Sequence, residues 1–375
     1  MTTEPVYLDH NATTPVHPEV RDAMLPWLGA EWGNPSSSHT FGRRAATALA
    51  HARAAVAQLV GAEPDAVVFT SGGTEADNLA LLGTRLAHPR VVISAVEHPA
   101  VEAAVRHRGG VELGVLAVDG QGRVDLERAA DVLAAPVGLL SVMLAQNETG
   151  VVQPVAQLAG LARHASPEVL VHCDAAQAVG KIDVDVAALG VDLLTIVGHK
   201  FYAPAGIGAL VVRRGVPLHA TTFGGGQERG LRSGTEPVAL AVALGAACSL
   251  AIRTGAAERA RQIALREELW ARLHAGIPGI VRSGAGVATL PNTLHVRIPG
   301  AAGSAVLAAA PDVAASTGSA CHADDHAASG VLGAMGVPAS EAAGALRLSL
   351  GRMTTHADVE RAANALVTAA AALRG

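Results

Sequence analysis

Lys200 is the residue whose type and position point most clearly to covalent chemistry. It ends the run Gly198-His199-Lys200, directly after an apolar segment, 191–197, that predicts a buried strand. A buried ammonium is costly unless it is paired, deprotonated or covalently used. The sequence has 28 Lys and Arg residues, but only Lys181 and Lys200 are lysines. Lys200 is therefore a candidate for imine formation with a carbonyl, and the alternative is a lysine that extends to solvent.

Polar side chains also follow three other predicted strands. His98 comes after 91–94, Asn147 after 139–144, and Asp174 after 169–173. Ligands collect at the carboxyl ends of strands in open parallel sheets, so we expect these side chains to lie near Lys200. An aspartate there can pair with a protonated ring nitrogen, as pyridoxal phosphate requires. The alternative for Asp174 is a cap on a helix that starts at Ala175.

The segment Phe69-Thr70-Ser71-Gly72-Gly73-Thr74-Glu75-Ala76-Asp77-Asn78 follows a predicted strand and opens a predicted helix. Glycines let backbone amides approach a ligand, and a helix start favours an anion such as phosphate. The segment matches neither the P-loop nor the dinucleotide-binding pattern. A helix start capped by Ser or Thr is the competing interpretation.

Two loops are more elaborate than a connection requires. Segment 223–235 is rich in glycine and charge, and segment 316–326 places Cys321 beside His322 among small residues. An exposed thiol next to an imidazolium has a lowered pKa and reacts readily. The alternative is a metal site, built from Cys321, His322, Asp324 and His326. Cys173 and Cys248 lie in apolar surroundings and are predicted to be small core residues.

The composition narrows the class of protein. Half of the 375 residues are hydrophobic, only 2% are aromatic, and the net charge is −5, so nothing indicates a nucleic-acid partner. No signal-peptide pattern and no uninterrupted apolar stretch of about 18 residues occurs, which favours a cytoplasmic protein without a membrane partner. Three dispersed cysteines do not make a disulfide framework.

The elements that must position these residues follow an alternating pattern. Short apolar runs alternate with helical segments from residue 66 onward, which predicts an α/β fold with a mostly parallel sheet covered on both faces. The predicted strands are 67–69, 91–94, 111–118, 139–144, 169–173, 193–197 and 208–212. Long helices and two short strands, 293–297 and 345–350, then predict a smaller α+β domain. We expect a large domain over 16–245 and a small domain built from 1–15 and 246–375.

With these motifs identified, the chain resembles the pyridoxal-phosphate cysteine desulfurases and selenocysteine lyases. These families belong to the class V aminotransferase branch of fold type I. The resemblance runs from Tyr7-Leu8-Asp9-His10-Asn11-Ala12-Thr13-Thr14 to Leu346-Arg347-Leu348-Ser349-Leu350-Gly351-Arg352, nearly the whole chain. It implies a fold type I enzyme with a large mixed-sheet domain, a small α+β domain, and pyridoxal 5'-phosphate as cofactor.

The resemblance also implies a role for each matching residue. Lys200 binds the cofactor covalently and later moves the substrate Cα proton, and Cys321 attacks the substrate sulfur or selenium. Asn147 and Arg347 bind the substrate carboxylate. For the cofactor ring, it implies His98 on the ring face, Asp174 on the ring nitrogen and Gln177 on the phenolic oxygen. For the phosphate, it implies contacts from Gly73, Thr74 and His199. Thr235 reaches the same phosphate from the other subunit of a homodimer.

The motifs leave two candidate substrates, L-cysteine and L-selenocysteine. Desulfurases often have serine where this chain has Val197, and Thr195 to Tyr202 as well as Cys321 to Asp324 look more like the selenocysteine lyases. Residues 232–235 and 318–321 look like the desulfurases. We expect conversion of L-cysteine to L-alanine with a persulfide on Cys321, passed to an acceptor protein such as an iron–sulfur scaffold, a tRNA-thiolation enzyme or a biosynthetic sulfur carrier. The alternatives are a selenocysteine lyase and, remotely, a non-catalytic scaffold.

Overall fold

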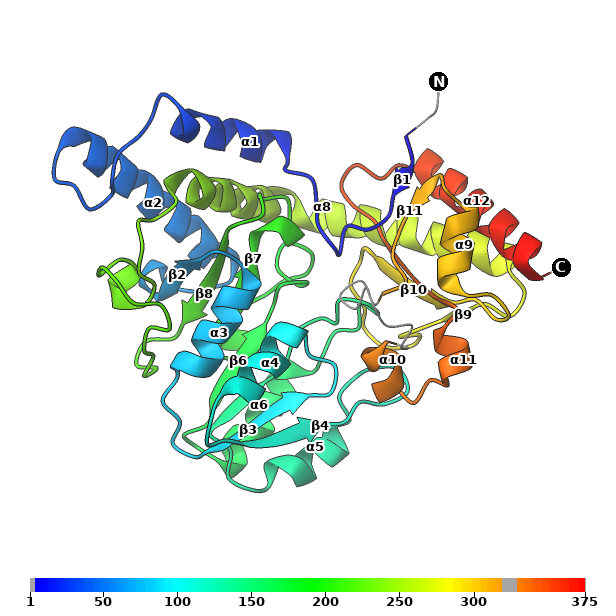
Figure 1. Ribbon diagram of the computed structural model, residues 1–375, viewed down its shortest axis with the longest axis horizontal. Helices are drawn as coiled ribbons and strands as arrows, with labels where there is room; N and C mark the ends of the chain where they lie inside the picture. Colours follow the sequence, from blue (N-terminus) through cyan, green and yellow to red (C-terminus); the bar gives the residue numbers. More distant parts are fainter. Residues whose placement is uncertain (1–3, 319–328, 375) are drawn as a thin grey trace.

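The computed structural model describes residues 4–318 and 329–374, and a seven-stranded sheet lies inside its larger part (Figure 1). The strand order is β2-β8-β7-β6-β5-β3-β4, and only β8 runs antiparallel to its neighbours. Each strand overlaps a predicted segment, so the expected mostly parallel mixed sheet is confirmed. The strands are β2 (Val67–Thr70), β3 (Arg90–Ser94), β4 (Glu112–Leu116), β5 (Leu139–Ser141), β6 (Leu170–Asp174), β7 (Leu193–Val197) and β8 (Gly208–Val212).

Helices cover both faces of this sheet, because the central strands are apolar on both sides. Along β7, Leu193 packs with residues of α3 (Gly73–Gly83), while Leu194 and Ile196 face the opposite core. This alternation is the two-residue period of a strand. Helix α4 (Pro99–His107) lies beside α3. The opposite core includes residues of α2 (Thr40–Leu59), α5 (Leu126–Leu133), α6 (Val155–Ala165) and the first half of α8 (Val238–Gly276).

The C-terminal part of the chain forms a second core together with the N-terminal segment. An antiparallel sheet has the order β12-β10-β9, and β1 pairs in parallel with β11, so residues far apart in sequence share this core. The strands are β1 (Val6–Tyr7), β9 (Val281–Arg282), β10 (Thr293–Arg297), β11 (Val313–Ala314) and β12 (Ala345–Ser349). The helices of this core are α9 (Gly303–Ala309) and α12 (His356–Arg374). Between them in the chain, α10 (Gly330–Ala334) and α11 (Ala339–Ala342) bury Leu332 and Ala342 in the first core.

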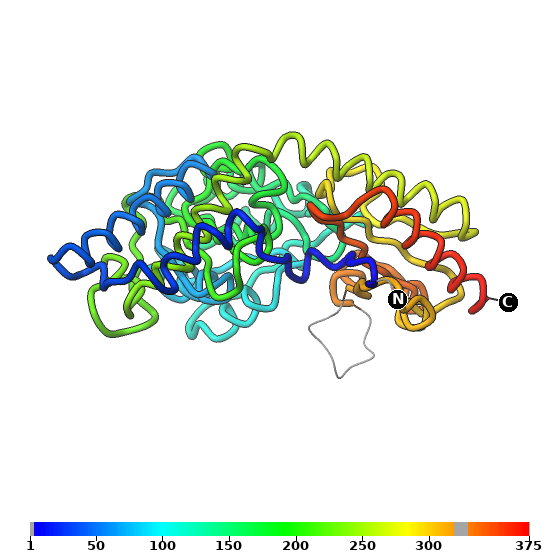
Figure 2. Tube along the Cα trace, turned by 90° about the horizontal axis from the view of Figure 1, so that it is seen from above, coloured from blue at the N-terminus to red at the C-terminus, as the bar shows by residue number. Residues whose placement is uncertain are grey.

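Helix α8 joins the two cores. It runs along the molecule from the large sheet to the C-terminal helix α12 (Figures 1 and 2). By length and composition a window of α8 is apolar enough to cross a membrane. Its residues Leu244 and Leu269 nevertheless pack in the first and second core, as expected of a core helix. The division at residue 245 stays a prediction, because α8 passes that point without a break.

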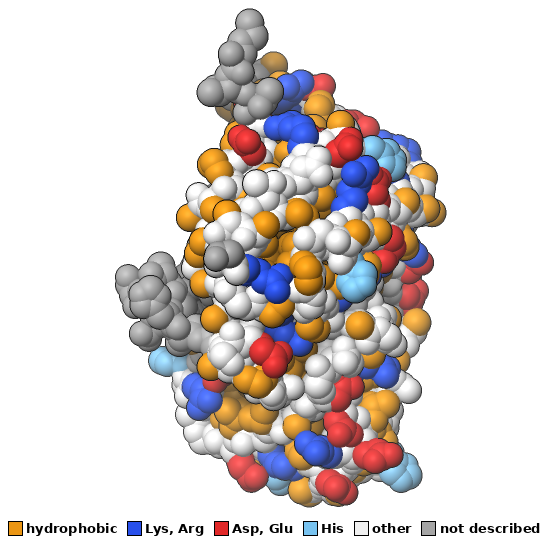
Figure 3. Space-filling view, turned by 90° about the vertical axis from the view of Figure 1, so that its right-hand side faces the viewer, with side chains coloured by type: hydrophobic (Ala, Val, Ile, Leu, Met, Phe, Trp, Pro, Cys, Tyr) orange, Lys and Arg blue, Asp and Glu red, His pale blue; other side chains and the backbone are white. Residues whose placement is uncertain are grey.

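Short elements connect these layers. Helix α1 (Pro18–Met24) ends where the chain tightens into the 3-10 turn η1 (Leu25–Leu28), which contains Pro26. The remaining elements are η2 (Pro64–Ala66), α7 (Val186–Leu189), η3 (Gly198–Lys200) and η4 (Glu228–Gly230). On the face in Figure 3, positive and negative side chains are interspersed, and no basic patch stands out.

Candidate active site

Most of the predicted site residues line one cavity between the two cores. The cavity has a volume of about 260 Å³, and it lies where the chain leaves β6 and β7 and meets the N-terminal segment and β12. It therefore occupies the expected carboxyl edge of the sheet. The predicted residues on its wall are Gly73, Thr74, His98, Asn147, Asp174, Gln177, His199, Lys200 and Arg347.

Lys200 places its amine inside this cavity. It ends the turn η3, which directly follows β7, so the strand fixes where the side chain starts. Its Nζ donates hydrogen bonds to the backbone carbonyl oxygens of Asn11 and Ala12, at 2.9 and 2.8 Å. The alternative of a lysine extended to solvent does not fit this arrangement. The chain's other lysine, Lys181, does not line the cavity.

A buried carboxyl cluster lies at the end of β6. Asp174 is 6% exposed, and its Oδ1 accepts a hydrogen bond from the Ala176 amide at 2.9 Å, but the residues that follow form turns and no α-helix starts there. Burial raises the pKa of Asp174, although the Ala176 amide, His98 and Lys200 oppose the shift. Burial, together with the Asp174 charge, also raises the pKa of Asp77, and burial raises that of Glu97 to about 8. A cationic group in the cavity would relieve this excess of acid groups.

Two neutral histidines face the cavity. His98 caps α4, since its Nδ1 accepts a hydrogen bond from the Ala100 amide at 3.1 Å, which leaves the ring proton on Nε2. Burial is the main cause of the lowered pKa of His98. Burial, with Lys200 and Lys181 nearby, lowers the pKa of His199 to about 4. An uncharged ring at His98 suits stacking on another flat ring.

The start of α3 forms the expected anion cradle. Gly73 and Thr74 both line the cavity, and no side chain caps this helix, so its first amides remain available to an anion. The alternative of a side-chain cap is therefore wrong. A Cβ atom at Gly73 would lie 2.6 Å from Cγ2 of Val197, which explains the need for glycine. Val197 puts a methyl group, without a hydrogen-bonding atom, on this part of the wall.

The other side of the cavity carries an oriented guanidinium. Arg347 lies on β12 and is 3% exposed, and its Nη2 pairs with Oδ1 of Asp9 at 2.7 Å. Its Nη1 donates to the backbone oxygen of Asn147 at 3.2 Å. Nε is buried without a hydrogen-bond partner among the described residues. Because guanidinium groups bind carboxylates well, Arg347 can hold an anionic substrate opposite Lys200.

Sequence reasoning gave no role to Asn11, which connects the parts of the site. Its Oδ1 accepts from Lys181 Nζ at 2.9 Å and from Asn292 Nδ2 at 3.1 Å. Its Nδ2 donates to Thr293 Oγ1 at 2.9 Å and to the Asn147 carbonyl at 3.2 Å. Its polar, turn-rich sequence context was the available signal. Only the packed structure brings these partners to one side chain.

Two predicted residues are not placed on this cavity. Cys321 and the alternative metal ligands His322, Asp324 and His326 lie outside the described residues, but Gly318, three positions before Cys321, lines the cavity. Thr235 lies on an exposed loop. The described residues contain no cluster of three metal-ligating side chains. Cys173 and Cys248 are buried and form no disulfide, as predicted for core residues.

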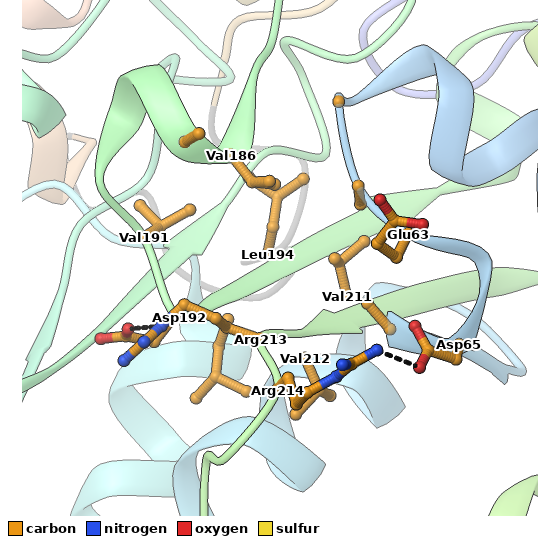
Figure 4. Close-up of a pocket in the computed structure, with 15 residues that line it drawn as sticks. Glu63, Asp65, Val186, Val191, Asp192, Leu194, Val211, Val212, Arg213 and Arg214 are labelled. Atoms are coloured by element: carbon orange, nitrogen blue, oxygen red, sulfur yellow. Dashed lines mark hydrogen bonds and ion pairs between the residues drawn. The ribbon is translucent and has the colours of Figure 1, made fainter.

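A larger cavity at the opposite end of β7 lacks such chemistry. It measures about 510 Å³, and Val186, Val191, Leu194 and Val211 form its apolar wall (Figure 4). Its two arginines form ion pairs, Arg213 with Asp192 and Arg214 with Asp65. The convergence of an amine, a carboxyl, an anion cradle and a guanidinium is what singles out the smaller cavity.

Comparison with known proteins agrees with this geometry. The family model described as aminotransferase class-V matches residues 6–362. The chain belongs to this family. Similar relatives include a cysteine desulfurase IscS from Anaeromyxobacter sp., 42% identical over 99% of this chain and 93% of the relative, and the cysteine desulfurase NifS from Azotobacter vinelandii, 41% identical over 95% and 90%. Nothing in these matches favours the selenocysteine lyase alternative.

Solved structures show the same fold. A NifS-like protein superimposes with a TM-score of 0.90 at 32% identity, covering 97% of this chain and 98% of the other. SspA in complex with cysteine superimposes with a TM-score of 0.79 at 31% identity, covering 92% and 98%. Fold type I is thereby confirmed.

The cofactor of this class-V enzyme is pyridoxal 5'-phosphate, and the cavity residues fit it. Lys200 supplies an amine for the aldehyde, and Asp174 supplies a buried carboxyl for the ring nitrogen. The uncapped start of α3 suits the phosphate, and the neutral His98 ring suits the ring face. The chemistry of the donor set therefore matches each part of the cofactor.

Proposed function

We propose that this protein is a cysteine desulfurase that converts L-cysteine to L-alanine and keeps the sulfur as a persulfide on Cys321. The observation that carries this proposal is the placement of Lys200, Asp174, Arg347 and Gly318 on one cavity wall. Gly318, on this wall, lies three positions before Cys321 in the sequence. The cysteine desulfurases among the relatives support the same reaction.

Arg347 and Lys200 define how the substrate is held. Arg347 is fixed by Asp9 and by the Asn147 carbonyl, so its guanidinium is oriented before the substrate carboxylate arrives. The Lys200 amine takes the proton from the substrate Cα. Bound pyridoxal phosphate supplies an electron sink for the charge left on that carbon.

Cys321 then performs the sulfur step as a thiolate. Its Sγ attacks the substrate sulfur and forms a sulfur–sulfur bond, while the substrate carbon–sulfur bond breaks and its electron pair stays on carbon. That carbon takes up a proton and becomes the methyl group of alanine. The sulfur remains on Cys321 as a persulfide, available to a sulfur-acceptor protein.

A homodimer is part of this proposal. Thr235 is exposed on its loop and does not line the cavity of its own chain, which suits a contact with the phosphate site of the other subunit. Exposed apolar side chains support an interface as well, since Phe223 is 87% and Trp32 63% exposed. We place the enzyme in the cytoplasm, as the sequence predicts.

Steady-state alanine production from L-cysteine and from L-selenocysteine tests the function. The wild-type protein should convert cysteine to alanine, and Lys200→Ala should have no activity. The C321A variant should bind cysteine but release no sulfane sulfur. Full sulfur release by C321A, or turnover of selenocysteine alone, would overturn the proposal.

A further inference from the structure

Lys181 is the lysine that does not line the cavity, but it contacts two residues that do, Gln177 and Asn11. Its Nζ donates hydrogen bonds to Oε1 of Gln177 at 2.7 Å and to Oδ1 of Asn11 at 2.9 Å. Burial lowers the pKa of Lys181 well below its ordinary value, and the charges of Lys200 and Arg347 lower it further. A costly amine in this position needs a reason, and the mechanism above does not use it.

The contacts of Gln177 show what this amine does. The Gln177 side chain lines the cavity, and its Nε2 donates to the Asn11 backbone oxygen at 2.9 Å. That carbonyl only accepts, so it faces Nε2, while the Lys181 amine donates to Oε1. Both contacts select the same orientation of the amide. Since Nε2 carries two hydrogens, one N–H remains for a ligand.

We propose that Lys181 is a positioning residue that holds the Gln177 amide so that its remaining Nε2–H is offered to an anionic oxygen of the bound cofactor. Without the Lys181 amine, Oε1 of Gln177 loses its donor, and a buried polar atom without a hydrogen-bond partner is unfavourable. A half rotation of the amide moves Oε1 out of this position but turns it toward two acceptors, the Asn11 carbonyl and the ligand oxygen. Lys181 disfavours that rotation.

A double-mutant cycle tests this coupling through cofactor binding. K181M and Q177M remove the amine and the amide at similar side-chain length. Each should raise the dissociation constant of pyridoxal phosphate from the apoprotein about tenfold. The double variant should bind no more weakly than Q177M alone. Additive losses from K181M and Q177M would overturn the proposal.

The visible absorbance of the bound cofactor gives a readout that stability alone does not move. An N–H donated to an anionic oxygen stabilises the deprotonated form of the bound cofactor. Loss of this N–H in K181M or Q177M should therefore raise the midpoint of the cofactor's pH titration by about one unit. K181R keeps a donor at this position and should have the wild-type midpoint. A K181R midpoint like that of Q177M would contradict the proposal. The variants keep the other titratable side chains that line the cavity: Asp77, Asp174, His98, His199, Lys200 and Arg347. K181M also removes a charge that lowers the pKa of His199, and K181R keeps that charge.

Asp183→Asn is the matched control. Asp183 lies two positions after Lys181 on the exposed side, where it pairs with Arg259. D183N should leave cofactor affinity and the titration midpoint unchanged. If D183N changed them as much as K181M does, the effect would belong to the turn as a whole, and the proposal would be overturned. Thermal melting of each apoprotein checks folding. These readouts do not use desulfurase activity, so the inference can fail or hold independently of the proposed function.

Discussion

Oδ1 of Asp9 lies 2.7 Å from Nη2 of Arg347, which ties the N-terminal segment to β12 at the wall of the active site. The pair is formed by residues 338 positions apart, and Arg347 is almost fully buried. The N-terminal segment therefore orients the guanidinium of Arg347, the group that we propose binds the substrate carboxylate.

Asp9→Asn should weaken substrate binding more than chemistry. The variant loses the charged partner of Arg347 but keeps a hydrogen-bond acceptor, so KM for cysteine should rise about tenfold with a smaller change in kcat. Steady-state kinetics measure both values. Glu112→Gln is the control, because it removes an exposed ion pair with Arg90 far from the cavity and should have no effect. An unchanged KM for D9N would show that Asp9 does not orient Arg347.

Covalent mapping should place the cofactor on Lys200 and not on Lys181. The sequence offers only these two lysines, and only Lys200 lines the cavity. Reduction of the loaded protein with borohydride, proteolysis and mass spectrometry will identify the modified peptide. Modification of Lys181 would refute the assignment of the catalytic amine.

Val197→Ser should strengthen cofactor binding. Val197 lies beside Gly73 at the phosphate cradle, and a serine there adds a hydroxyl donor. Hydrogen bonds to charged groups contribute about 1.5–3 kcal/mol, less the loss of apolar packing, so we expect affinity to rise about threefold to tenfold. Titration of the apoprotein with pyridoxal phosphate measures the change. Weaker binding by V197S would mean that the methyl contact with the helix start matters more.

Glu97 should make the apoprotein less stable as pH rises toward 8. Burial raises the pKa of Glu97 to about 8, so the folded state retains a proton that the unfolded state loses near pH 4.5. The free energy of unfolding therefore falls with rising pH across this window. Between pH 6.5 and 8 the fall is about 2 kcal/mol, from about 1.4 kcal/mol for each pH unit.

Urea unfolding of the apoprotein at several pH values will measure this effect. Histidines with lowered pKa, such as His172 at about 3 and His10 at about 4, act in the opposite direction, but only below about pH 6.5. The difference between wild type and E97Q isolates the carboxyl, since E97Q should lack this part of the slope. Parallel curves for the two proteins would rule out Glu97 as the cause.

Local patterns in the sequence predicted the strands and the order of the polar motifs. The alternation of short apolar runs with helical segments predicted the parallel core, because a strand buried on both faces needs a continuous apolar run. The position of Lys200 just after such a run predicted a reactive amine at the sheet edge. The same reasoning left the Asp174 and Gly73 alternatives open, since a cap and a ligand site use the same residue types.

The sequence by itself determined the family, the sheet and the chemical groups available to the active site, because these depend on residue types and short-range periodicity. Only the tertiary structure decided that Asn11, Lys181 and Asp9 belong to that site. Asn11 contacts Asn147 and Lys181 across 136 and 170 positions, and Asp9 contacts Arg347 across 338 positions. Such contacts form when the two cores pack together, and no local pattern encodes which buried polar atoms will then meet.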